Sequence, residues 1–106
     1  MSWHRTPEVA AALGVAYAHI GRTEESLKLA AGAIKEYRAG HGGRMWPATI
    51  LVRAGRIFLS AGRFDEAANY AREALALTRK FGARGIEASA LSLTADIVAA
   101  SGAENA

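Results

Sequence analysis

The chain has 106 residues, of which 51% are hydrophobic, and it carries 13 basic and 10 acidic side chains, two prolines and no cysteine. This composition indicates one folded domain and excludes a disulfide framework or a zinc site built on cysteine. No apolar run of signal-peptide type opens the chain, and no segment is apolar enough to cross a membrane, so we expect a cytoplasmic protein.

Apolar residues recur at steps of three and four positions along most of the chain, as in amphipathic helices. Pro7 suits the first turn of a helix, and Gly21 and Gly82 stand where helices are expected to end. The glycine-rich stretch 40–44 is expected to be a loop, and Gly102 to close the last helix. The sequence therefore predicts an all-α fold of five helices, at about 7–20, 23–38, 47–61, 64–81 and 86–101.

The second half of the chain repeats the first. Seven residues recur 41 positions later, namely Gly14, Gly21, Arg22, Glu25, Ala30, Ala33 and Arg38 as Gly55, Gly62, Arg63, Glu66, Ala71, Ala74 and Arg79. A third, partial copy at a shift of 40 aligns Gly102 with Gly62 and Ala95 with Gly55. Such periods are typical of solenoids, in which stacked helical hairpins cover one another's apolar faces. We expect a single domain over 1–106 with two and a half hairpins: repeat 1 at about 7–45, repeat 2 at about 47–85 and a half repeat at 86–102.

A common motif opens each repeat. It reads Ala10-x2-Leu13-Gly14-x2-Tyr17 in the first and Leu51-x2-Ala54-Gly55-x2-Phe58 in the second. The pattern resembles the tetratricopeptide (TPR) repeat, W-x2-L-G-x2-Y followed by A-x3-F. The resemblance implies a right-handed superhelix of antiparallel hairpins, whose two helices approach closely at Gly14 and Gly55. Residues 54–101 are also similar to the long-period TPR arrays of bacterial signalling proteins linked to cyclases or ATPases. This likeness implies a non-catalytic interaction or scaffolding module, either alone or as the regulatory or oligomerisation part of a larger protein.

In TPR arrays, the first helices of successive hairpins line a concave face that binds peptides. The resemblance assigns this role to Val15, His19, Thr49, Val52, Arg53, Arg56, Ser92 and Asp96. Arg53 and Arg56 are the candidates for binding an acidic protein or peptide partner. Because Arg56 and Asp96 are aligned in neighbouring repeats, an ion pair between them is the alternative to ligand binding. The clamp by which some TPR domains hold a chaperone's C-terminus is not expected, since only Arg56 has a suitable side chain at its positions.

Catalysis, a metal site and a cofactor are not expected. The three histidines, His4, His19 and His41, lack the spacing of metal ligands, and no nucleophile motif or phosphate-binding loop is present. The basic excess leaves a nucleic-acid-binding helical repeat as the alternative function. The net charge is only +3, and several arginines stand at helix ends, where they offset the dipole, so we expect protein partners.

The fifth expected helix is apolar over more of its circumference than one neighbouring helix can cover. Its large apolar residues are Leu91, Leu93, Ile97 and Val98, together with Ile86. We expect the chain to self-associate through the first four, as a twofold homodimer, unless it is a fragment of a longer array.

Overall fold

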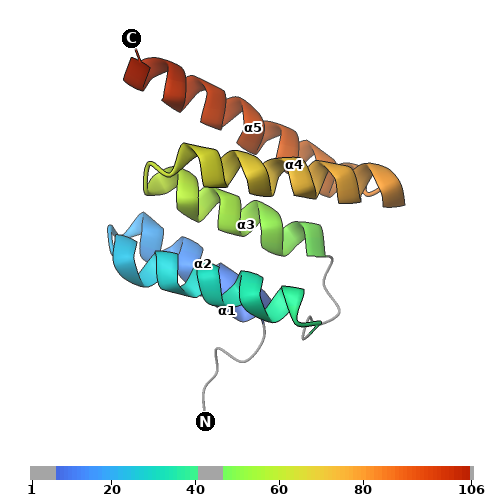
Figure 1. Cartoon of the computed structure of the whole chain (residues 1–106), viewed down its shortest axis with the longest axis horizontal. Helices are drawn as coiled ribbons and strands as arrows, with labels where there is room; N and C mark the ends of the chain where they lie inside the picture. Colours follow the sequence, from blue (N-terminus) through green and yellow to red (C-terminus); the bar gives the residue numbers. More distant parts are fainter. Residues whose placement is uncertain (1–6, 41–46, 106) are drawn as a thin grey trace.

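The computed structural model describes residues 7–40 and 47–105, and the five expected helices lie within them (Figure 1). No strand occurs in these two ranges, so the all-α prediction is confirmed. His4, His41 and most of the expected glycine loop fall outside the described residues. The helices are α1 (Pro7–His19), α2 (Thr23–Arg38), α3 (Pro47–Ser60), α4 (Phe64–Phe81) and α5 (Arg84–Asn105).

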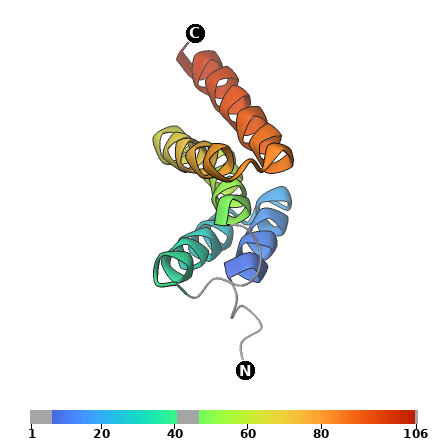
Figure 2. The same ribbon diagram turned by 90° about the vertical axis from the view of Figure 1, so that its right-hand side faces the viewer.

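The helices form stacked antiparallel hairpins. α1 packs on α2 and α3 packs on α4, while the odd-numbered helices also contact one another in the order α1, α3, α5. Figure 2 shows α2 and α4 on one side of the stack, with α1 and α5 at its two ends. The odd-numbered helices therefore form a continuous face, which is where sequence reasoning placed the partner-binding residues.

The turns of the two hairpins are copies of each other. Gly21 and Gly62 adopt φ values of +81° and +76°, a left-handed conformation that glycine reaches without steric cost. The next residue of each turn donates its N–H to the preceding helix, from Arg22 to Tyr17 O at 2.9 Å and from Arg63 to Phe58 O at 2.8 Å. The sequence repeat of 41 residues is therefore a structural repeat in this region.

Two other glycines allow the hairpins to stack. A Cβ at Gly14 would lie 2.7 Å from Ile57 Cδ1 of α3, and a Cβ at Gly55 would lie 2.6 Å from Leu93 Cδ2 of α5. Within its own hairpin, each glycine has more room, with nearest atoms at 3.3 Å and 3.5 Å. The predicted close approach is therefore present, but it is tightest between successive hairpins rather than within one.

The predicted bounds of the fifth helix were wrong at both ends. α5 begins at Arg84, includes Gly85, and continues through Gly102 to Asn105. Gly102 lacks the positive φ found at Gly21 and Gly62. Glycine permits a left-handed turn but does not impose one, and inside a helix it costs only about 1 kcal/mol relative to alanine.

The predicted alignment of α5 with α3 was wrong by one helical turn. Ile57 of α3 fills the space at Gly14 of α1, and it lies two residues after Gly55, the α3 equivalent of Gly14. In the next hairpin Leu93 of α5 fills the space at Gly55, so the α5 equivalent of Gly55 should lie two residues before Leu93. The equivalent is therefore Leu91, and the shift is 91 − 55 = 36 residues rather than 40. Burial agrees, because Ala54 and Ile57 are fully buried and so are Ala90 and Leu93, at a shift of 36. A shift of 40 differs by one turn and keeps the same helix face, so small-residue matches alone could not distinguish the two.

Candidate functional site

Two pockets lie along the face formed by α1, α3 and α5, and together we call them the groove. The first, between α1 and α3, has a volume of about 220 Å³ and is lined by Val15, Ala18, His19, Arg56, Ile57, Leu59 and Ser60. The second, between α3 and α5, has a volume of about 210 Å³ and is lined by Thr49, Val52, Arg53, Ile86 and Ser89. Both pockets are mainly apolar and contain basic but no acidic lining residues.

Six of the eight residues predicted to bind a partner line the groove. Val15, His19 and Arg56 line the first pocket, and Thr49, Val52 and Arg53 line the second. Ser92 and Asp96 are exposed on α5 and bond to Arg56. Val52 is only 9% exposed, so it serves as pocket wall.

Sequence reasoning missed four lining residues, Ile57 and Ser60 in the first pocket and Ile86 and Ser89 in the second. Ser60 lies one helical turn after Arg56, so helical spacing offered a signal for it. Ser89 is the equivalent of Arg53 at the shift of 36 residues, and it was missed because the shift was set at 40.

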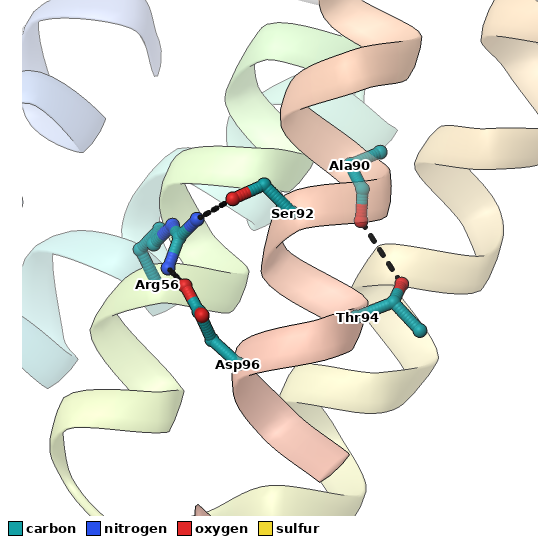
Figure 3. A network of polar contacts seen from close by, with 5 residues as sticks. All are labelled: Arg56, Ala90, Ser92, Thr94 and Asp96. Carbon is teal, nitrogen blue, oxygen red and sulfur yellow. Dashed lines mark hydrogen bonds and ion pairs between the residues drawn. The ribbon is translucent and has the colours of Figure 1, made fainter. Parts of the chain in front are cut away.

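Arg56 is tied down by α5. Its Nη1 donates to Asp96 Oδ2 at 2.5 Å, and its Nη2 donates to Ser92 Oγ at 3.3 Å (Figure 3). The ion pair between neighbouring repeats, which the sequence left as an alternative, is therefore present. An exposed pair of this kind contributes at most about 1 kcal/mol to stability, but it occupies the guanidinium.

Arg53 is the cation of the groove that has no carboxylate beside it. It is half-buried on α3, lines the second pocket, and forms no ion pair with any acidic residue in 9–40 or 47–102. A half-buried cation interacts more strongly with an incoming anion than a fully solvated one, because the surrounding protein lowers the local dielectric. Of the two arginines predicted to bind an acidic partner, Arg53 is thus the one available to do so.

The comparison with protein families agrees with the architecture. A family model described as "Tetratricopeptide repeat" matches residues 6–80. The chain belongs to the tetratricopeptide repeat family. Repeats of this family generally mediate protein–protein interactions. No curated protein and no solved structure matches the chain.

The match ends one residue before the C-terminus of α4, so α5 lies beyond the matched part of this TPR domain.

The four α5 residues predicted for self-association do not share one surface in the structure. Leu93 and Ile97 are 0% and 7% exposed and belong to the core, whereas Leu91 and Val98 are 46% and 65% exposed. Leu93 and Ile97 therefore cannot form the predicted surface, because α3 and α4 already cover them. The homodimer itself stays a prediction.

Three arginines of the TPR domain, Arg38, Arg56 and Arg79, link its helices to one another. Arg38 makes a bidentate pair with Glu73 at 2.9 and 3.1 Å, joining α2 to α4, and the bond to Glu73 raises the pKa of Arg38. Arg79 binds Glu87 at 3.1 Å, joining α4 to α5. Within the described residues, no cluster of three metal-binding side chains exists, and no helix is long and apolar enough to span a membrane.

Proposed function

We propose that this TPR domain binds a protein partner through an acidic and partly apolar segment seated in the groove. The observation that carries the proposal is Arg53, a half-buried cation that pairs with no carboxylate of residues 9–40 or 47–102. The other residues that line its pocket are Thr49, Val52, Ile86 and Ser89. An acidic side chain of the partner supplies the missing counter-charge, and its apolar side chains fill the pockets.

The spacing of the two pockets defines the segment further. They flank different halves of α3, residues 49–53 and 56–60, whose centres lie about seven residues or roughly 10 Å apart along the helix. An extended peptide covers about 3.3 Å per residue, so at least three residues separate its acidic side chain from the one in the first pocket. That second side chain is apolar, because four of the seven residues that line the first pocket are apolar, namely Val15, Ala18, Ile57 and Leu59.

Selection from a display library of linear peptides tests the proposal. The full chain should enrich peptides with Asp or Glu and an apolar residue at least three positions away. A charge-assisted hydrogen bond is worth about 1.5–3 kcal/mol, so Arg53→Glu should weaken binding of a selected peptide by about tenfold or more, and Arg53→Gln by less. Arg72→Glu, which reverses an exposed charge on α4, is the matched control and should leave affinity unchanged.

Two results would contradict the proposal. One is a set of selected peptides with no excess of acidic residues. The other is equal loss of affinity in Arg53→Glu and Arg72→Glu, which would point to overall charge rather than to the groove. Circular dichroism melts of each variant separate a binding defect from a folding defect.

Nucleic-acid binding has less support. Arg22, Arg38, Arg56, Arg63 and Arg79 are each paired with a carboxylate of the chain. These five arginines could neutralise phosphates only if their pairs were broken, and three of the pairs join neighbouring helices. Affinity for an oligonucleotide that falls steeply with salt would revive this alternative.

The similarity to cyclase-linked and ATPase-linked arrays supports a wider role. We propose that the domain is a regulatory module of a cytoplasmic bacterial signalling protein. The reading frame that encodes it tests this role directly: a cyclase or ATPase segment in the same frame is expected, and a frame without either would contradict it.

A further inference from the structure

The exposed apolar residues lie mainly at the two ends of the stack. Five large apolar side chains of the described residues are at least 38% exposed. Two belong to the first end, Val9 on α1 and Ile20 directly after it, and two belong to α5, Leu91 and Val98. The fifth is Phe81, at the C-terminus of α4. The end helices thus each expose apolar side chains. Figure 2 shows these two helices toward opposite ends of the stack.

The contacts between odd-numbered helices follow one rule inside the chain. A glycine of the earlier helix receives a large side chain of the later one, Ile57 at Gly14 and Leu93 at Gly55. The rule predicts which residues of the two end helices would meet if the same contact continued. On α5 the equivalent of the glycine is Leu91, and on α1 the equivalent of Ile57 is Ala16, since 57 − 41 = 16.

At the two end helices the large and the small residue of this contact are exchanged. Leu91 is large and protrudes from α5 where the inner helices have glycine, whereas Ala16 is small and exposed on α1 where the inner helices have Ile or Leu. Extending the register by one turn places Ile20 against the exposed Ala95 and beside Val98. At each step a large residue of one end therefore faces a small residue of the other.

We propose that copies of this chain associate head to tail, with the outer face of α5 in one copy packed on the outer face of α1 in the next. The occupant of each end is thus a second copy, and the contact continues the interface that already joins α1 to α3 and α3 to α5. Leu91 is also the reason that a further hairpin helix is not the occupant. The residues equivalent to Leu91 are Gly14 and Gly55, where an added Cβ would lie 3.3 Å from α2 and 3.5 Å from α4, the second helix of each hairpin. A leucine side chain at this position therefore leaves no room for a second hairpin helix at the same distance.

The contact joins two different surfaces, so it does not close after two copies and extends into chains whose length rises with concentration. One pair of helices buries less than the roughly 800 Å² per partner of a standard interface, so we expect association at micromolar concentration or above.

Two complementary variants of the full chain test the direction of association by sedimentation velocity. Leu91→Glu places a charge on the α5 face and keeps the α1 face, and Ile20→Glu does the reverse. Burial of either carboxylate is unfavourable, so each variant alone should be monomeric, with association weakened by about tenfold or more. An equimolar mixture should form a one-to-one heterodimer that does not grow. Phe81→Glu alters the one exposed large apolar residue of the five that lies at neither end of the stack, and this variant should assemble like the unmodified chain.

Every other pattern overturns the proposal. A twofold dimer through α5 would leave Ile20→Glu dimeric and Leu91→Glu monomeric, with no heterodimer in the mixture. A twofold dimer through α1 would give the opposite result. An unmodified chain that stays monomeric at all accessible concentrations would show that the two faces do not bind each other. Circular dichroism melts confirm that each exposed substitution leaves the fold intact.

Discussion

The contact between Gly55 and Leu93 allows the stacking of hairpins to be tested by adding a single methyl group. In Gly55→Ala, the new Cβ would lie 2.6 Å from Leu93 Cδ2, whereas carbon atoms in ordinary contact are about 3.5–4.0 Å apart. Leu93 must therefore move by about 1 Å. It is fully buried, so other core side chains must move with it.

Two opposing terms set the size of the effect. Alanine is favoured over glycine in a helix interior by about 1 kcal/mol, and overpacking a core costs about 1–3 kcal/mol. We expect Gly55→Ala to lower the free energy of unfolding by about 1 kcal/mol net. In a domain of this size that corresponds to a fall in Tm of about 4–8 °C.

Urea unfolding followed by circular dichroism measures the effect in a double-mutant cycle. Leu93→Val deletes the Cδ atoms that meet the new methyl group, so in that background Gly55→Ala should become stabilising by about 1 kcal/mol. Gly32→Ala is the matched control: it lies inside α2 with no atom within 4 Å of its new Cβ, and it should stabilise by about the same amount.

The reasoning would be refuted if Gly55→Ala stabilised the unmodified chain as much as Gly32→Ala does. That result would mean that α3 and α5 do not approach as closely as the structure shows. A Gly55→Ala effect that stayed equally destabilising in the Leu93→Val background would place the clash elsewhere.

Two further predictions concern α5 and Tyr70 on α4. Gly102→Ala should raise Tm, because Gly102 lies inside α5 and alanine is the better helix former. Gly62→Ala should lower Tm, because alanine at φ +76° costs about 1–2 kcal/mol. Equal falls of Tm in both variants would mean that the helix ends at Gly102. Burial raises the pKa of the half-buried Tyr70 above 10.0, so the stability gained from its neutral phenol is complete below that pH and is lost as pH rises through the folded-state value. Urea midpoints should therefore fall less at alkaline pH in Tyr70→Phe than in the unmodified chain, and identical pH profiles would contradict the assignment.

Local signals accounted for the elements that sequence reasoning predicted well. The expected ranges 23–38 and 64–81 coincide with α2 and α4, because acidic residues, basic residues and turn glycines mark their ends. The repeat of 41 residues was equally readable, since its identities fall on turns and close contacts. The groove residues followed from the resemblance to TPR repeats rather than from any local pattern.

The position of α5 could not be read in the same way. Alanine and larger apolar residues occur on every side of this helix, so periodicity does not indicate which face is buried. Packing against α3 and α4 decides that Leu93 and Ile97 are core while Leu91 and Val98 are exposed. The same tertiary choice fixes which arginine is paired, because Asp96 and Ser92 reach Arg56 and not Arg53.

The most direct test of the account is an NMR titration of the isotopically labelled full chain with an acidic peptide obtained from the display selection. Because the partner is proposed to bind in the groove, the largest chemical-shift changes should fall on Val15, Thr49 and Arg53, with little change at Ala31 and Arg72 on α2 and α4. Arg53→Glu should abolish those changes at the same peptide concentration. Shifts confined to α2 and α4, or unchanged shifts in Arg53→Glu, would contradict the claim that the groove is the binding site.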